Sequence, residues 1–236
     1  MSARVIIITG TSRGIGQGLA SHYLARGDVV CGCSRAPAAA ELAHERYAHF
    51  NLDVADEAAV VSMVRTVARR HGRIDALVNN AGIAAMNHAL ISPASVARAI
   101  FATNFHGTFL FAREVGKVMV RQRHGRIVNL STVATPLQLE GESLYAASKA
   151  AVENFTRILA RELGSSGVTV NAVGPTPIPT DLVRNVAEEK ITALLARQAI
   201  RRLGTIDDVA NVVDFFLAPG SGFVTGQVLY LGGVSS

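Results

Sequence analysis

The sequence predicts an α/β fold: a doubly wound parallel sheet of about seven strands with helices on both faces. Short runs of β-branched residues alternate with helical patterns along the 236 residues. These runs lack polar alternation, which indicates strands covered on both sides, and connections long enough to hold a helix favour parallel pairing. No linker rich in Pro, Gly or Ser divides the chain, so we expect residues 1–236 to form a single domain.

The strands are predicted from their content of Val, Ile and other apolar residues. Val5–Thr9, with the sequence Val-Ile-Ile-Ile-Thr, is the first. The strands expected after it are Val29–Cys33, Tyr47–Leu52, Ile74–Asn79, Arg126–Leu130, Val168–Val173 and Gln227–Leu231.

The helices are predicted where apolar residues recur at helical spacing between these strands. They are expected over Gly14–Arg26, Asp56–His71, Pro93–Arg121, Tyr145–Gly164 and Ile206–Leu217. The segment 176–201 differs, because after Pro175 it opens with Thr-Pro-Ile-Pro-Thr and then becomes amphipathic. We interpret it as a substrate lid.

The composition argues against several classes of partner. The net charge is +5, but the basic residues are scattered and form no basic helix with interleaved aromatics, so no nucleic acid is expected. The first apolar run has four residues, too few for a signal peptide or a membrane span, so we expect a soluble cytoplasmic protein without a membrane partner. The seven histidines lack ligand spacing, and no metal is expected.

The turn after the first strand is typical of a dinucleotide site. It follows Thr9 directly and leads at once into a helix, whose first N–H groups and dipole attract phosphate, while its glycines let the backbone approach. The residues expected to hold the cofactor here are Gly10, Ser12, Arg13, Gly14, Ile15 and Gly16.

The end of the second strand favours NADP(H) over NAD(H). An NAD site usually has an acid here for the ribose 2′-hydroxyl, whereas this chain has Ser34 and Arg35, and no carboxylate before Glu41. Arg35 and Arg13 suit charge-assisted hydrogen bonds to a 2′-phosphate. The alternative is that both arginines are plain surface residues.

Tyr145 and Lys149 lie four residues apart on a predicted helix, so one turn places an ammonium beside a phenol. A nearby cation favours the phenolate, so we expect Lys149 to lower the pKa of Tyr145 and make it an acid or base. In the alternative interpretation the ring only packs on the helix and the lysine lies in solvent.

Three motifs in this order resemble the short-chain dehydrogenase/reductase family. They are Gly10-x-x-x-Gly14-x-Gly16, Asn79-Asn80-Ala81-Gly82 and Tyr145-x-x-x-Lys149, and the match runs nearly end to end. The pattern is most similar to the 3-oxoacyl-carrier-protein reductase branch. The resemblance implies a Rossmann-type fold and NADP(H)-dependent reduction of a ketone to a secondary alcohol, with Tyr145 as proton donor.

The resemblance also implies roles for further residues. Lys149 would hold the nicotinamide ribose, and Asn104 would hold a water that leads to this lysine. Alternatively, Asn104 is a buried helix residue that bonds backbone. The other cofactor contacts implied are Asp53 and Val54 at the adenine, Asn80, Ala81 and Gly82 along the cofactor, and Pro175, Ile178 and Thr180 at the nicotinamide.

Two neighbouring residues are candidates for the catalytic hydroxyl. The family has a serine thirteen residues before the tyrosine, and this spacing gives Thr132, with Ser131 one residue earlier. Neighbours in a strand point to opposite faces, so only one of them can face the substrate. The spacing favours Thr132.

The implied partners are a carbonyl substrate, further copies of the chain in a homotetramer, and an acyl carrier protein. Of the two arginines that dock the carrier in this branch, Arg123 is present and Ser166 replaces the other. Thr176 stands where the family has a glycine in the substrate loop. The alternative function is a non-catalytic NADP(H) sensor or scaffold on the same fold.

Overall fold

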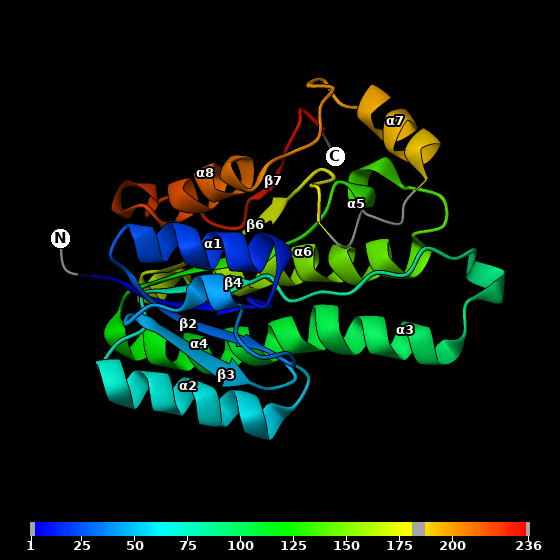
Figure 1. Ribbon diagram of the computed structural model, residues 1–236. Helices are drawn as coiled ribbons and strands as arrows, with labels where there is room; N and C mark the ends of the chain where they lie inside the picture. The colour runs from blue at the N-terminus through cyan, green and yellow to red at the C-terminus, as the bar shows by residue number, and fades with distance from the viewer. Residues whose placement is uncertain (1–2, 181–186, 235–236) are drawn as a thin grey trace.

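The computed structural model describes residues 3–180 and 187–234. Within this part, seven parallel strands form one sheet in the order β3-β2-β1-β4-β5-β6-β7, with helices on both sides (Figure 1). The predicted fold class is confirmed. The strands are β1 Val5–Thr9, β2 Val29–Ser34, β3 Tyr47–Asn51, β4 Ala76–Asn79, β5 Gly125–Leu130, β6 Val168–Gly174 and β7 Val228–Tyr230.

Five long helices cover the sheet, α1 and α8 on one face and α2, α4 and α6 on the other (Figure 1). The helices are α1 Gly14–Ala25, α2 Glu57–His71, α3 Ala94–Phe101, α4 Gly107–Gln122, α5 Ala134–Leu137, α6 Ser143–Leu163, α7 Glu188–Ala196 and α8 Ile206–Leu217. Short 3₁₀ turns lie at Ala40–Leu42, Ala89–Ile91, Gly164–Ser166 and Pro219–Ser221.

Each face of the sheet has its own apolar core, which explains why the strands lack polar alternation. Side chains alternate along β1, so Ile6 and Ile8 point to one core and Ile7 to the other. The first core includes Leu19, Tyr23, Val209, Val213 and Phe216 from α1 and α8. The second includes Val60, Met63, Leu110, Phe111 and Leu159 from α2, α4 and α6.

The helix expected over 93–121 is interrupted by one wide turn. A π-helix, Ala102–His106, joins α3 to α4. Its buried residue Asn104 bonds both polar groups of the Ile83 backbone, accepting from N at 2.8 Å and donating to O at 2.9 Å. Such turns commonly accompany functional sites, and here the wide turn coincides with a side chain committed to a neighbouring loop.

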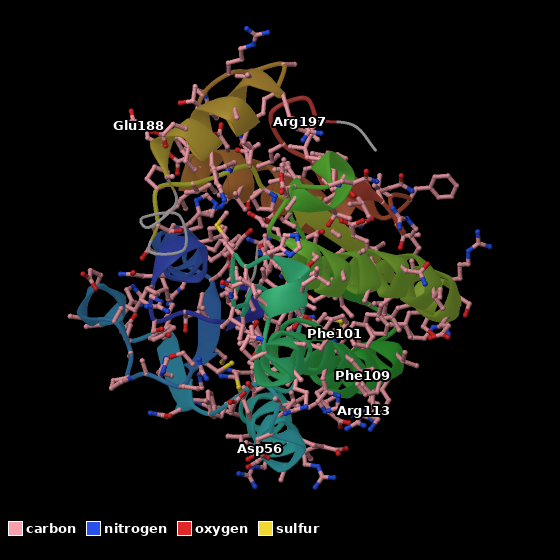
Figure 2. The ribbon with its side chains drawn as sticks, turned by 90° about the vertical axis from the view of Figure 1, so that its right-hand side faces the viewer. Asp56, Phe101, Phe109, Arg113, Glu188 and Arg197 are labelled. Carbon is pink, nitrogen blue, oxygen red and sulfur yellow. The ribbon has the colours of Figure 1, made fainter. Side chains whose placement is uncertain are left out.

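The predicted lid is described only in part. Residues 176–180 form a loop, α7 follows from Glu188, and 181–186 lie outside the described residues. Leu194 of α7 packs against an apolar cluster that includes Leu137 of α5, and the two helices lie side by side in Figure 1. Figure 2 shows the two ends of α7, marked by Glu188 and Arg197, far from Asp56 at the start of α2. No helix in the described part is long and apolar enough to cross a membrane.

Candidate active site

The site lies where the order of the strands reverses, because β1 has β2 on one side and β4 on the other. Ligands of open parallel sheets bind outside the carboxyl ends of the strands at such a point. Gly10 and Gly14 have φ of +75° and +61°, values that favour glycine. A Cβ on Gly16 would lie 2.2 Å from the Gly10 oxygen, so this turn accepts no side chain there.

Asn80 serves the phosphate turn more directly than expected. Its Nδ2 donates to the carbonyl oxygens of Thr9 at 2.8 Å and Gly10 at 3.2 Å. The Thr9 hydroxyl accepts in return from the backbone N–H of Asn80 at 3.0 Å and of Ala81 at 2.9 Å. Thr9 therefore joins β1 to the loop after β4, and Asn80 acts by shaping the turn.

A chain of hydrogen bonds supports the end of β2. The hydroxyls of Thr11 and Tyr47 lie 2.9 Å apart, and the Tyr47 hydroxyl lies 2.9 Å from Nδ1 of His49. The other ring nitrogen of His49 is 3.0 Å from the carbonyl oxygen of Ala36, which also accepts from Ser34 at 2.7 Å. The loop that carries Arg35 is thereby fixed to β3.

The two arginines predicted to bind the 2′-phosphate of the cofactor lie at the surface around this loop. Arg13 and Arg35 are both exposed, one at the start of α1 and the other just after β2. Val54 is buried against Gly107, whereas Asp53 accepts a 2.9 Å hydrogen bond from the N–H of Ala55.

Tyr145 is half-buried in the first turn of α6. Burial raises its pKa to about 12, the charge of Glu142 adds to this, and a hydrogen bond with Thr132 acts in the opposite direction. The expected lowering of this pKa by Lys149 was wrong, because burial of the ring outweighs the other effects. Tyr145 is therefore protonated at neutral pH, the form that donates a proton.

Ser131 and Thr132 point in different directions, as expected of neighbours in extended backbone. The Thr132 hydroxyl interacts with Tyr145 and accepts from the N–H of Ala134 at 3.2 Å. The Ser131 hydroxyl instead donates to the buried carboxylate of Glu153. Of the two candidates, the structure brings Thr132 to the tyrosine.

Lys149 is 4% exposed, so it does not project into solvent as the alternative interpretation required. Its Nζ donates to the carbonyl oxygen of Leu130 at 2.7 Å. Burial lowers its pKa to about 8, although the charge of Glu153 acts in the opposite direction. The side chain is therefore mostly charged at neutral pH and loses its proton slightly above it.

Asn104 and Gly82 lie beside this lysine. A Cβ on Gly82 would lie 3.4 Å from Oδ1 of Asn104 and 3.5 Å from Nζ of Lys149. The Asn104 amide also donates to the Ser148 hydroxyl at 3.0 Å, next to the lysine on α6. Asn104 therefore bonds backbone, as the alternative held, and also borders the lysine.

The segment after β6 closes the other side of the site. The carbonyl oxygen of Pro175 accepts from the N–H of Val133 at 3.1 Å, and Ile178 is buried in the core under α1 and α8. A Cβ on Gly14 would lie 3.5 Å from the methyl carbon of Thr180, so this segment reaches the phosphate turn. The buried side chain of Thr176 lies against Gly204 and Gly232.

Three residues of this arrangement were not predicted from the sequence: Thr9, Glu153 and Tyr230. A hydroxyl at the end of a strand, directly before the glycine turn, was a usable signal for Thr9. Glu153 also follows Lys149 at helical spacing, so its charge lies one turn away. Tyr230 had no signal, because its 2.8 Å hydrogen bond to Glu153 joins segments far apart in the sequence.

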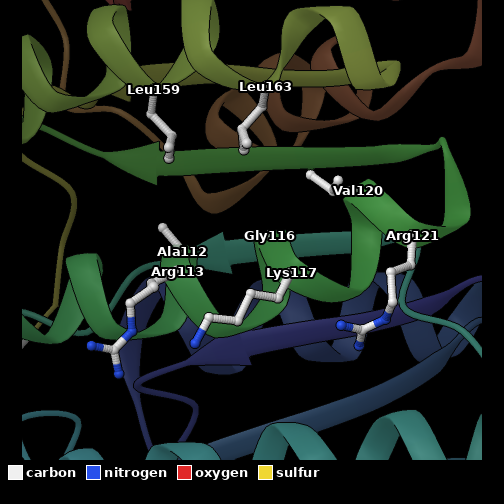
Figure 3. A pocket seen from close by; sticks show the side chains of 8 residues that line it. All are labelled: Ala112, Arg113, Gly116, Lys117, Val120, Arg121, Leu159 and Leu163. Carbon is white, nitrogen blue, oxygen red and sulfur yellow. The ribbon is translucent and has the colours of Figure 1, made fainter.

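A groove on the outer surface lies elsewhere. Figure 3 shows it between α4 and α6, with Leu159 and Leu163 facing Ala112 and Gly116. Leu159 follows Tyr145 by fourteen residues, which places it roughly 20 Å along the helix. The groove is therefore separate from the site around Tyr145.

Comparison with known proteins identifies the family. The profile described as enoyl-(acyl carrier protein) reductase matches residues 10–235. The 3-oxoacyl-[acyl-carrier-protein] reductase FabG of Escherichia coli is 33% identical over 235 residues, 98% of this chain and 96% of the relative. The chain belongs to the short-chain dehydrogenase/reductase family. The corresponding reductase of Synechocystis is 35% identical over 242 residues, 99% of this chain and 97% of the relative.

Solved structures of other short-chain dehydrogenases agree with this assignment. The aldohexose dehydrogenase of Thermoplasma acidophilum superposes with a TM-score of 0.90 at 30% identity, covering 98% of this chain and 94% of that one. ElxO, solved with NADP bound, superposes with a TM-score of 0.89 at 29% identity, covering 98% of both chains. This short-chain dehydrogenase/reductase is an oxidoreductase by family.

Proposed function

We propose that this short-chain dehydrogenase/reductase is an NADP(H)-dependent enzyme that reduces a ketone, a 3-oxoacyl compound or a similar carbonyl, to a secondary alcohol. One observation carries the proposal: a half-buried Tyr145, with its pKa raised to about 12, meets the Thr132 hydroxyl one turn before a buried lysine. This arrangement combines a proton donor with a second donor for the same oxygen.

The chain offers a suitable place for the dinucleotide. The glycine turn leaves no room for a side chain at Gly16, and the first N–H groups of α1 follow it. Arg13 and Arg35 are the cations that suit a 2′-phosphate, and Lys149 is the residue that suits the nicotinamide ribose. A bound nicotinamide supplies the hydride.

The residues of the chain handle the proton. Thr132 donates a hydrogen bond to the carbonyl oxygen and orients it, and Tyr145 protonates that oxygen as negative charge develops on it. Lys149 lies one helical turn from the phenolate that remains, and in this proposal it holds the nicotinamide ribose beside it. Asn104 is the residue proposed to hold the water through which Tyr145 regains its proton.

An apolar substrate fits the surroundings of Thr132. Val133, Leu137 and Val234 form a small apolar cluster of their own, against which Leu139, Leu194 and Tyr230 pack. The cluster continues directly from Thr132 into α5 and the lid helix α7. Reductases of 3-oxoacyl carrier proteins among the relatives support a substrate of this kind.

Outward-facing aromatic rings support the proposed homotetramer. Apolar spacing along the predicted helix marks a stripe of Phe101, Phe105, Thr108, Phe109 and Ala112. In the structure Thr108 and Ala112 of this stripe are buried, whereas Phe101 is 37% exposed. Figure 2 shows Phe101, Phe109 and Arg113 on one side of the molecule. Phe105 and Phe109 contact the ring of Phe155 on α6 edge to face. Ile158, one turn after Phe155 on the same helix, is exposed. Helices α3, α4 and α6 are therefore the proposed subunit contacts.

Docking of an acyl carrier protein involves Arg123 in this proposal. Arg123 is exposed in the turn between α4 and β5, at the amino edge of the sheet, whereas Thr132 follows the carboxyl end of β5. Six residues of strand span roughly 20 Å, so a carrier bound at Arg123 would serve the site of a neighbouring subunit.

Oxidation of NADPH by the purified protein tests the function. The panel comprises 3-oxoacyl thioesters, diketones and cyclic ketones, with Tyr145→Phe as the variant that lacks the proton donor. We expect turnover of at least one carbonyl and a loss of roughly 100-fold or more in kcat in the variant. If NADPH binds but no carbonyl is reduced, the protein is a sensor or scaffold instead.

A further inference from the structure

The buried residue Glu153 connects three parts of the site. It is 4% exposed on α6, one helical turn after Lys149. One carboxylate oxygen accepts from the Ser131 hydroxyl after β5, and the other accepts from the Tyr230 hydroxyl of β7 at 2.8 Å. Because both hydroxyls donate, both oxygens are acceptors, as in an ionised carboxylate.

A carboxylate buried at this depth needs partners that compensate for the loss of water. Burying an acid costs free energy unless hydrogen bonds or an opposite charge compensate. Two hydroxyls supply the hydrogen bonds. Two cations, Lys149 and Arg157, each lie one turn away on α6, and of the two the ammonium of Lys149 is the buried one. That ammonium donates to the carbonyl oxygen of Leu130, so the carboxylate acts on it through charge across one turn.

We propose that Glu153 is a positioning residue of the active site, which keeps the Lys149 ammonium charged and, by binding Ser131, leaves Thr132 as the hydroxyl that faces Tyr145. The role in catalysis rests on the proposed ketone reduction. The effect on Lys149 does not depend on turnover, because it is a property of the folded chain.

The electrostatic surroundings of this pair support the assignment. The charge of Glu153 opposes the lowering of the Lys149 pKa by burial. Tyr230, which faces the carboxylate from β7, has a raised pKa because of its own burial and because of Glu153, while Arg157 acts in the opposite direction. At the start of α6, the charge of Glu142 raises the pKa of Tyr145. Within the described part of the chain, Glu153 is the negative group whose charge acts on Lys149.

Lysine NMR tests the proposal directly. The chain has only three lysines, Lys117, Lys149 and Lys190, so isotope-labelled lysine gives three side-chain signals, and Lys149→Arg assigns the relevant one. In Glu153→Gln, which keeps the size of the side chain, removes its charge and exchanges one acceptor oxygen for an NH₂ donor, we expect the Lys149 midpoint to fall by about one pH unit. Glu153→Asp keeps the charge and should restore most of the midpoint.

Glu162→Gln is the matched control, because it removes the same charge from an exposed position on the same helix. Its Lys149 midpoint should equal that of the wild type, and thermal melting confirms that each variant is folded. An unchanged midpoint in folded Glu153→Gln would overturn the proposal.

The pH profile of kcat/KM extends the test to catalysis. The free enzyme should lose activity as pH rises through about 8, where Lys149 loses its proton, and Glu153→Gln should move this limb to lower pH. If the wild type turns over no carbonyl, the proposed function fails while the NMR result still decides the role of Glu153. If turnover is normal and the midpoint does not move, only the role of Glu153 fails.

Discussion

Replacement of Thr132 by valine tests which hydroxyl serves the chemistry. Valine has nearly the shape of threonine, so Thr132→Val removes the hydroxyl and leaves the buried volume almost unchanged. Two interactions are lost, the one with Tyr145 and the 3.2 Å hydrogen bond from the N–H of Ala134. The first bears on catalysis and the second on stability.

The magnitude follows from these two losses. A donor aimed at the oxygen where charge develops contributes roughly 100- to 1,000-fold to kcat. The N–H of Ala134, a residue 2% exposed, would lose its partner at a cost of about 1–3 kcal/mol in the free energy of unfolding. Because the Thr132 hydrogen bond lowers the pKa of Tyr145, its removal should also raise that pKa further.

The assay is steady-state oxidation of NADPH, with thermal melting of each variant beside it. Thr132→Ser keeps the hydroxyl and should retain kcat within about tenfold. Ser131→Ala is the matched control one residue away: it removes a donor to Glu153, so it should lower the melting temperature and change kcat by less than about tenfold. A Ser131→Ala variant without activity, beside an active Thr132→Val, would refute the assignment.

Two further predictions concern the cofactor and the lysine. Arg35→Asp should raise the KM for NADPH roughly 10- to 100-fold, because a charge-assisted hydrogen bond to phosphate is lost, and should leave the KM for NADH unchanged or lower. Arg69→Asp, which changes an exposed arginine on α2, is the control. Equal effects on both cofactors, or the same effect in the control, would contradict the NADP(H) assignment. Asn104→Ala should lower kcat about tenfold or more, and steady-state kinetics measures this. It should also reduce the melting temperature by several degrees in calorimetry, because the N–H and C=O of Ile83 lose their partner. A normal kcat with a lower melting temperature would make Asn104 purely structural.

The parallel sheet and its strands could be predicted because the signals are local. β-branched runs covered on both faces, joined by segments of helical spacing, leave few topologies, and the glycine turn after β1 marks the start of a dinucleotide fold. The π-turn at Ala102–His106 could not be predicted in this way. The turn carries Asn104, whose side chain bonds Ile83, a loop residue twenty-one positions away in the sequence.

The catalytic hydroxyl shows the same limit. Spacing from Tyr145 favoured Thr132, but only the structure shows that Ser131 binds Glu153. The expected lowering of the Tyr145 pKa failed for a related reason. The sequence places Lys149 one turn away, yet the pKa depends on how deeply each group is buried, and burial depends on the whole fold.

Thr176 shows how a departure from the family pattern is accommodated. A Cβ on Gly204 would lie 2.7 Å from the Thr176 hydroxyl, and one on Gly232 would lie 2.9 Å from its methyl carbon. The threonine side chain thus occupies space that two glycines leave open, and Gly232 also needs its glycine for a φ of +73°. Since β7 ends with Tyr230, two residues before Gly232, the C-terminal segment both receives Thr176 and holds Glu153. The substrate loop and the carboxylate behind Lys149 therefore depend on the same short segment, so a change that displaces it should disturb both.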